Sequence, residues 1–222
     1  MMERTAVIIG ASGLIGSHLV EQMLKDDFFG IVRVLVRKEL QLTHKKLEQE
    51  IVDFSDVNDY TKKFGEGDII FCCIGTTNKK VNGDNAAYEK IDFTIPFNAA
   101  KIALDKSYKK FLMVSSVGAN SNSKNFYLKL KGRIENALKE FPFESISIFR
   151  PGQLLGKRNE YRQAEYFLQG VTQFISNFLF GSLKKYHSIA AENVAKAMIA
   201  QSKKPTQGVH ILEYYEMVQL IR

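Results

Sequence analysis

Two side chains with complementary acid–base chemistry lie four residues apart in the middle of this chain. Tyr127 and Lys131 belong to a run of helical composition, so they would lie on one side of a helix, one turn apart. An ammonium beside a phenol favours the phenolate, and such a tyrosine can give or take the proton that accompanies hydride transfer at a carbonyl. The alternative is an ordinary amphipathic helix, because Tyr and Lys are both common in this sequence.

A pair of serines precedes this helix and could supply a hydroxyl to the same chemistry. Ser115 and Ser116 follow the apolar run 111–114, which predicts a buried strand. A hydroxyl at the end of that strand could hydrogen-bond the oxygen of a carbonyl substrate. The order of the motifs strengthens this interpretation: a glycine-rich loop comes first, then a strand ending in serine, then Tyr127 and Lys131 on the next helix.

Three glycines near the start of the chain, Gly10, Gly13 and Gly16, have the spacing G-x-x-G-x-x-G. A strand-like run precedes them and a run of helical composition follows. Glycine lets the backbone turn tightly and approach a ligand, and the helix would direct its unpaired N–H groups and positive dipole end at that ligand. A pyrophosphate fits this arrangement. A strand-to-helix turn without a ligand is the alternative, but the flanking elements favour dinucleotide binding.

Two cations, Arg37 and Lys38, follow the second strand-like run, 31–36. In folds that prefer NAD, an acidic residue near this point binds the ribose 2′-hydroxyl. A guanidinium can instead pair with a 2′-phosphate and stack on the adenine. The position of these cations therefore favours NADP(H) over NAD(H), although chance would often supply a surface basic pair in a chain this rich in Lys and Arg.

Residues after the next two strands could line the same cofactor pocket. Asp53 could accept a hydrogen bond from the adenine amino group, with Phe54 beside the ring, and a helix N-cap arrangement within 53–56 is an equally weighted alternative. At the carboxyl edge of a parallel sheet, Gly75 would let the chain pass close to the ribose, and Thr76 offers a hydroxyl there. A plain exit from strand to loop is the alternative for these two residues.

The elements that must position these residues predict an α/β fold. Strand-like runs alternate with helical runs, a pattern that predicts a doubly wound parallel sheet with helices on both faces. After the strand before Gly10, we expect strands at 31–36, 51–52, 68–73, 110–115, 145–149 and 208–212. Besides the helix after the glycines, we expect helices at 44–49, 56–64, 86–105, 126–141 and 193–200.

Length and composition are those of one globular domain. The 222 residues suffice for one sizeable core, and 45% hydrophobic and 25% charged residues are ordinary for a globular protein. We expect a single NAD(P)-binding domain over residues 1–222, with a helical insertion at about 155–187 on the substrate side. Apolar residues recur there at helical spacing within 158–186. Packing on the domain is the favoured interpretation, a wall of the substrate pocket is the functional one, and a membrane-surface helix is a distant third.

Charge and cysteine content argue against several functions. The formal net charge is +7, but the lysines are scattered and no nucleic-acid module is recognised, so we expect no nucleic-acid partner. Cys72 and Cys73 are adjacent and would point to opposite faces of a strand, so we interpret them as reduced and expect no metal site. No apolar run approaches the roughly 20 residues that span a bilayer. With no recognised signal peptide, we expect a cytoplasmic location.

Together these motifs resemble those of an atypical short-chain dehydrogenase/reductase. The glycine spacing, the serine pair, Tyr127 with Lys131, and the run Phe-Arg-Pro-Gly at 149–152 match that group in order. Within it, the chain is similar to the Tat-interacting protein family, an oxidoreductase-like group, over nearly its whole length. The runs that carry this likeness are 52–54, 71–77, 125–128 and 150–155.

The resemblance implies a Rossmann-type fold that binds NADPH. Tyr127 and Lys131 would carry catalysis and touch the nicotinamide ribose, and Ser116 is preferred over Ser115 as their hydroxyl partner because a Ser-x-Gly run after the strand matches the wider superfamily. Ser115 stays open as the alternative. The residues that would contact the cofactor by this resemblance are Ser12, Gly13, Leu14, Ile15, Arg37, Lys38, Ile74, Gly75, Tyr127, Lys131, Leu154 and Arg162.

The sequence therefore predicts an NADPH-dependent oxidoreductase acting on a small carbonyl substrate. Tyr127 would be the proton donor, Lys131 its activator, and Ser116 the group that orients the substrate oxygen. One alternative is an NADPH-binding redox sensor that engages a protein partner with little or no turnover. A nucleotide-sugar epimerase is ranked lower, because few residues follow Arg150 to wall a large substrate pocket. The sequence leaves the substrate and the oligomeric state open.

Overall fold

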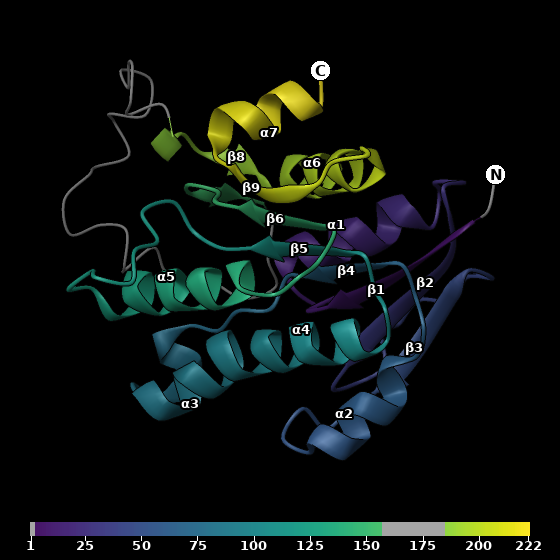
Figure 1. Ribbon diagram of the computed structural model, residues 1–222, viewed down its shortest axis with the longest axis horizontal. Helices are drawn as coiled ribbons and strands as arrows, with labels where there is room; N and C mark the ends of the chain where they lie inside the picture. Colours follow the sequence, from purple (N-terminus) through teal and green to yellow (C-terminus); the bar gives the residue numbers. More distant parts are fainter. Residues whose placement is uncertain (1–2, 157–184) are drawn as a thin grey trace.

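The computed structural model describes residues 3–156 and 185–222, and its centre is a sheet of seven parallel strands (Figure 1). These strands are β1 (Arg4–Ile9), β2 (Phe29–Val36), β3 (Leu47–Ile51), β4 (Ile69–Cys72), β5 (Lys110–Val114), β6 (Ser145–Phe149) and β9 (Gly208–Leu212). Their order across the sheet is β3-β2-β1-β4-β5-β6-β9. A separate short parallel pair is formed by β7 (Leu154–Leu155) and β8 (Ile189–Ala190).

Helices cover both faces of the sheet, which confirms the predicted doubly wound α/β fold (Figure 1). One face carries α1 (Leu14–Met23), α6 (Ala191–Lys203) and the short α7 (Tyr214–Leu220). The other carries α2 (Val57–Phe64), α4 (Ile95–Asp105) and α5 (Phe126–Lys139). Because the helices that follow the neighbouring strands β1 and β4 lie on opposite faces, the winding reverses between these two strands. Ligands of open α/β sheets bind at such a switch point.

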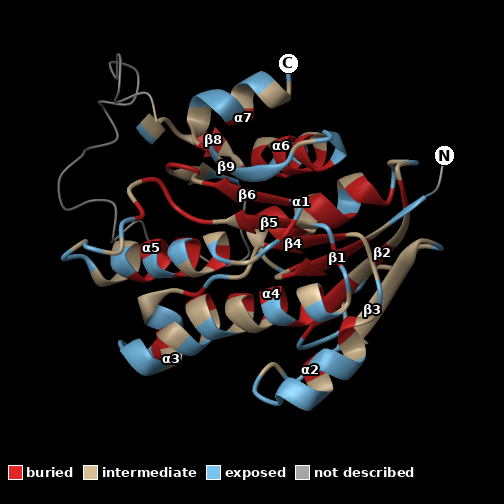
Figure 2. Cartoon of the chain, viewed as in Figure 1, coloured by how far each residue is buried: buried red, intermediate tan, exposed pale blue. Residues whose placement is uncertain are grey.

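The central strands are apolar on both sides because both sides are covered. In β1, Ala6 and Ile8 are fully buried in the cluster that includes α1 and α6, whereas Val7 and Ile9 are fully buried in the cluster that includes α2 and α4. Figure 2 shows the buried residues concentrated in the central strands and on the sheet-facing sides of the helices. Continuous apolar runs of this kind are typical of parallel strands with both faces covered.

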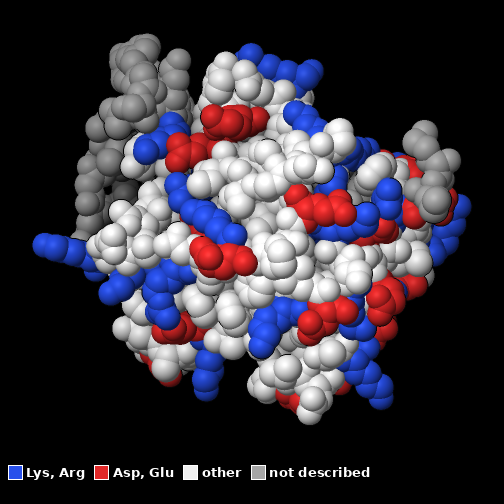
Figure 3. Space-filling view, viewed as in Figure 1, with Lys and Arg blue, Asp and Glu red and all other residues white. Residues whose placement is uncertain are grey.

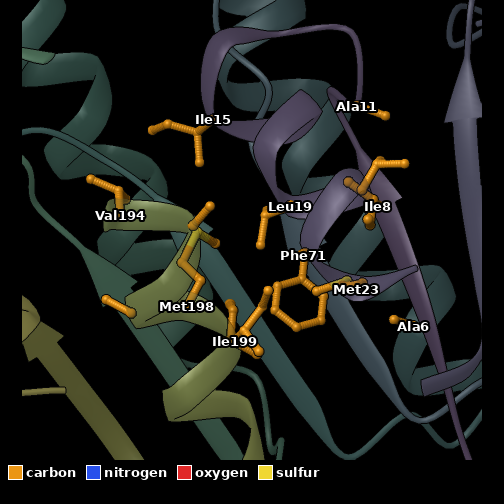
Figure 4. Packing of buried hydrophobic residues seen from close by; sticks show 14 of the residues in the cluster. Ala6, Ile8, Ala11, Ile15, Leu19, Met23, Phe71, Val194, Met198 and Ile199 are labelled. Atoms are coloured by element: carbon orange, nitrogen blue, oxygen red, sulfur yellow. The ribbon is translucent and has the colours of Figure 1, made fainter. Parts of the chain in front are cut away.

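Helix α1 is held by its packing against α6 and the sheet (Figure 4). Leu19 and Met23 of α1 are fully buried in one cluster with Phe71 of β4 and with Met198 of α6. Truncating a buried leucine such as Leu19 to alanine costs about 2–5 kcal/mol in comparable cores. This packing fixes the position of the glycine loop that precedes α1.

One predicted helix is wrong: residues 44–49 form no helix, and β3 begins at Leu47. Leu, Glu and Gln favour helices, but the chain here pairs in parallel with β2, and backbone pairing overrides that local preference. Side chains fix the pairing as well. Glu48 accepts a 2.9 Å hydrogen bond from Arg33 Nε of β2, and the Gln49 amide bonds to backbone atoms of Leu40.

The predicted helix at 86–105 is interrupted. It is divided into α3 (Asn85–Glu89), a π-helical turn at Lys90–Thr94, and α4. A 3-10 turn at Asn78–Val81 precedes α3. Pro96 stands in the first turn of α4 and has no N–H to bond to a carbonyl four residues earlier, which favours a wider turn just before it. The predicted helix at 158–186 lies, except for its last two residues, outside the described residues.

Charged residues are mixed on the visible surface. Lys and Arg are interspersed with Asp and Glu on the face shown in Figure 3. Among helices in the described ranges 3–156 and 185–222, none is both long and apolar enough to cross a membrane.

Candidate functional site

The predicted site residues lie in the segments that follow parallel strands, so the sheet brings these segments to one edge. The glycine loop follows β1, Arg37 and Lys38 follow β2, and the run that begins at Cys73 follows β4. The serine pair follows β5.

Two of the three glycines are required by the chain's own packing. Gly10 has φ +86°, and a Cβ there would lie 2.7 Å from the carbonyl carbon of Cys73, so the β1 and β4 loops touch at this point. A Cβ on Gly16 would overlap the carbonyl oxygen of Gly10. At Gly13 the nearest atom to an added Cβ is Gly10 O at 3.1 Å, and the backbone is extended. Close loop packing thus explains Gly10 and Gly16, and Gly13 is the glycine with most room beside it.

The N-terminus of α1 fits an anionic ligand. Gly13 is its N-cap and offers no side-chain acceptor, and the first turn contains no acidic residue. By contrast, Asp56 caps α2 and Asn125 caps α5 with their side-chain oxygens. Ser12 is exposed beside this end of α1. Uncapped N–H groups and the positive end of the helix dipole are the features that hold a pyrophosphate.

The residues expected around the adenine end lie at the exits of β2 and β3. Arg37 and Lys38 are exposed, and neither forms an ion pair with another residue in the described ranges. Asp53 accepts hydrogen bonds from Ser55 N (2.9 Å) and Ser55 Oγ (2.6 Å), and these bonds lower its pKa. Phe54 packs edge-on against Tyr60 at 4.9 Å between ring centroids. Asp53 thus shapes the turn before α2, and its contact with adenine stays a prediction.

The β4 exit loop is tied down by a buried carboxylate. The Thr76 N–H donates to Asp92 Oδ2 at 2.7 Å, and Tyr88 Oη donates to the Thr76 carbonyl at 3.0 Å. Thr76 is buried, Gly75 is exposed, and Ile74 packs partly against the core. The sequence did not single out Asp92, which lies in the π-helical turn.

Tyr127 and Lys131 lie one turn apart on α5, as the spacing predicts. Lys131 Nζ is 5.9 Å from the centroid of the Tyr127 ring, and it forms a 2.9 Å ion pair with Asp92 Oδ1. Lys131 is 4% exposed, whereas Tyr127 is half-buried. Burial alone would lower the pKa of Lys131, but the interactions with Asp92, Tyr127 and Cys72 together outweigh burial and raise that pKa above its ordinary value.

The two serines have different partners. Ser115 Oγ donates to Glu135 Oε1 at 2.5 Å, so its hydroxyl is engaged by a carboxylate of α5 that is 1% exposed. Ser116 Oγ donates to the Val117 carbonyl at 3.2 Å, a bond at the long end of the normal range. Both side chains are buried. The weaker engagement of Ser116 agrees with its choice over Ser115 as the substrate-orienting group, which stays a prediction.

Glu135 also binds the arginine of the Arg-Pro-Gly run. Arg150 Nε donates to Glu135 Oε1 at 3.0 Å, and Arg150 Nη2 pairs with Glu135 Oε2. Glu213, which follows β9, lies 3.9 Å from Arg150 Nη1. This network joins the exits of β5, β6 and β9 to α5. Glu135 was not among the residues predicted from the sequence, although its place four residues after Lys131 puts it on the same side of the helix.

The segment after Arg150 returns toward α1. A Cβ on Gly156 would lie 3.0 Å from Leu14 Cδ1, so this segment reaches the first turn of α1. Leu154 forms β7 and packs partly against the core. Arg162 lies outside the described residues, and its predicted contact with the cofactor stays a prediction.

Comparison with known proteins decides the family. A family described as NAD(P)H-binding matches residues 10–205. The chain belongs to this NAD(P)H-binding family. Protein HTATIP2 of Rattus norvegicus is 30% identical over 228 residues, covering 99% of this chain and 90% of that protein. Protein FMP52, mitochondrial, of Meyerozyma guilliermondii is 33% identical over 205 residues, covering 91% and 87%.

These relatives confirm the predicted resemblance to the Tat-interacting protein family within the NAD(P)H-binding family. They also correct one prediction. The expected cytoplasmic location is contradicted, because the FMP52 relatives from several fungi are named mitochondrial proteins. That expectation was based on the absence of a recognised signal peptide, which is a weak basis for a location.

Solved structures of similar fold bind dinucleotides or nucleotide sugars. The Bordetella bronchiseptica enzyme WbmF in complex with NAD+ has a TM-score of 0.70 at 15% identity, over 99% of this chain and 76% of that one. A UDP-N-acetylglucosamine 4-epimerase from Methanobrevibacter ruminantium M1 has a TM-score of 0.69 at 18% identity, over 96% and 77%. Likeness at this identity shows the fold alone, and a nicotinamide cofactor for this chain follows from the NAD(P)H-binding family.

Proposed function

We propose that this protein is an NADP(H)-dependent oxidoreductase that reduces a carbonyl group of a small molecule. The observation that carries the proposal is the pairing of Tyr127 with a buried, charged Lys131 on α5, in a chain of an NAD(P)H-binding family. When bound, the reduced dinucleotide supplies a hydride to the carbonyl carbon. The chain's own residues then have to supply a proton and orient the substrate.

Tyr127 supplies the proton. Its hydroxyl hydrogen passes to the carbonyl oxygen as the alcohol forms, and the Lys131 ammonium, 5.9 Å from the ring centroid, places a positive charge beside the oxygen that gives up this proton. Ser116 orients the same oxygen through its hydroxyl. The opposite reaction, oxidation of an alcohol, uses the same groups with Tyr127 as the base.

Binding of the phosphates is assigned to the start of α1. Ser12, Gly13, Leu14 and Ile15 surround the uncapped N–H groups there. Arg37 and Lys38, exposed and without ion-pair partners in the described ranges, are assigned to a 2′-phosphate, which makes NADP(H) the preferred cofactor. The helical insertion expected at about 155–187 on the substrate side lies mostly outside the described residues and stays a prediction.

The test is turnover with a panel of small aldehydes and ketones, followed through NADPH absorbance. We expect wild-type protein to consume NADPH with at least one of them, and Tyr127→Phe to lower the rate about 10²–10⁴-fold. Tyr215→Phe is the matched control, because Tyr215 is 58% exposed and lies outside the site. Equal rates for wild type and Tyr127→Phe would refute the role of Tyr127. Tight NADPH binding without turnover on any carbonyl would favour the redox-sensing alternative.

A further inference from the structure

Asp92 is a buried carboxylate to which the proposed reaction assigns no part. Its side chain is 0% exposed, and it stands in the π-helical turn between α3 and α4. Carboxylates are rarely this buried unless they are paired, because an isolated charge loses its hydration there. The groups that Asp92 contacts therefore indicate its role.

The two oxygens of Asp92 contact two different parts of the site. Oδ1 forms the 2.9 Å ion pair with Lys131 Nζ of α5, and Oδ2 accepts the 2.7 Å hydrogen bond from the Thr76 N–H. Oδ1 has no further hydrogen-bond partner among the described residues. One carboxylate thus joins the lysine of the proposed proton chemistry to the loop expected beside the ribose.

The charge of Lys131 depends on this contact. Among the described residues, the ionisable groups that act most on its ammonium are Asp92 from the π-helical turn, Tyr127 from its own helix, and Cys72 from the end of β4. Burial raises the pKa of the Cys72 thiol to about 11, so near neutral pH this thiol is uncharged. Asp92 is therefore the carboxylate that compensates Lys131 within the described part of the chain.

A second ion pair between neighbouring elements provides a comparison. Glu89 at the end of α3 pairs with Arg133 of α5 at 2.7 Å, but both side chains are substantially exposed. That pair joins α5 to the same segment without placing a charge in the core. A buried pair is a poor way to gain stability, because desolvation offsets much of the attraction. Simple attachment of α5 therefore does not account for the burial of Asp92 against Lys131.

We propose that Asp92 is a positioning residue, which holds Lys131 charged and in place beside Tyr127 and fixes the Thr76 end of the β4 exit loop. The inference rests on the proposed function, because it assigns Asp92 to the support of that proton chemistry. Asp92 itself touches neither substrate nor cofactor. It acts through Lys131 and Thr76.

The first test measures the charge of Lys131 in the free protein, without any cofactor. Protein labelled with 13C at the lysine Cε is titrated by NMR, and the Lys131 signal is assigned from its loss in Lys131→Met. We expect wild-type Lys131 to titrate above pH 10.5. Asp92→Asn keeps the size of the side chain and an oxygen for the Thr76 N–H but removes the charge, and we expect it to lower the Lys131 pKa.

The second test measures kcat/KM against pH with a carbonyl that the wild type reduces. In Asp92→Asn, Lys131 loses its proton within the assay range, so kcat/KM should fall about tenfold per pH unit above the lowered Lys131 pKa and recover at lower pH. Glu89→Gln is the matched control and should follow the wild-type profile. A merely structural role for Asp92 would lower the rate equally at every pH.

Three results would overturn the proposal. They are a wild-type Lys131 that titrates below pH 10.5, an unchanged Lys131 titration in Asp92→Asn, and an Asp92→Asn rate profile parallel to that of the wild type. If Asp92→Asn fails to fold, the wild-type titration of Lys131 alone still tests the proposal. Failure of the proposed function is distinguishable, because it gives no turnover in a wild-type protein whose Lys131 titration still depends on Asp92.

Discussion

Replacing Glu135 by glutamine should destabilise the protein far more than replacing an exposed glutamate. Glu135 is 1% exposed, and it receives hydrogen bonds from Ser115 and Arg150. In Glu135→Gln the shape is kept, but the Arg150 guanidinium loses its charged partner, and the new amide N–H₂ group faces guanidinium donors. Loss of one partner of a buried ion pair costs about 3–5 kcal/mol.

The lower end of that range applies here. The Arg150 side chain is 18% exposed, so solvent still reaches it, and Glu213 at 3.9 Å offers a second carboxylate. We therefore expect a loss of about 3 kcal/mol in the free energy of unfolding. For a chain of this size, each kcal/mol lowers Tm by about 2–4 °C, which gives a fall of roughly 6–12 °C.

The assay is urea unfolding followed by circular dichroism. Glu89→Gln is the matched control, because the Glu89–Arg133 pair is exposed and such pairs contribute about 0–1 kcal/mol. Arg150→Met combined with Glu135→Gln should cost less than the sum of the two single variants, since the residues interact directly. A loss in Glu135→Gln equal to that of Glu89→Gln, or strictly additive costs, would refute the buried network.

Three further predictions test the loop geometry, the pH dependence and the cofactor preference. Gly16→Ala should fail to fold stably because its Cβ overlaps a backbone oxygen, whereas Gly13→Ala should fold, as measured by circular dichroism; equal stability would contradict this geometry. Burial raises the pKa of Cys72 from 9.0 to about 11, so the free energy of unfolding keeps its full value below pH 9 and falls by about 2 kcal/mol by pH 11 as the thiol of the unfolded chain ionises. In Cys72→Ala, the free energy of unfolding, measured by urea titration at each pH, should fall less between pH 9 and 11 than in the wild type. An equal fall in both proteins would argue against the raised Cys72 pKa. Arg37→Gln with Lys38→Gln should weaken NADPH binding about tenfold or more in calorimetry but leave NADH binding unchanged, and an equal loss for both would reject the 2′-phosphate contact.

The alternation of strands and helices could be predicted because it depends on local apolar runs. β6 and β9 have the predicted bounds. The helix predicted at 44–49 was wrong because its residues prefer helix locally, and only the neighbouring β2 makes β3 a strand. Such pairing with a distant segment leaves no trace in the local composition.

The candidate site likewise contains residues that local spacing predicts and residues that only tertiary contacts reveal. The spacing of Tyr127 and Lys131 is local, so their placement on one side of α5 could be predicted. Asp92 could not be found from spacing, because it meets Lys131 only after the π-helical turn packs against α5. Likewise, the partners that distinguish Ser115 from Ser116 come from another element and from the backbone.

The central claim is that a nicotinamide dinucleotide binds with its phosphates at the start of α1. Isothermal titration calorimetry of the wild-type protein with NADPH, NADP+, NADH and NAD+ tests it most directly. We expect one binding site per chain, tighter for the 2′-phosphorylated forms and weakened in Gly13→Ala, whose added methyl group narrows the space beside the uncapped N–H groups. No association with any of the four dinucleotides would contradict the account.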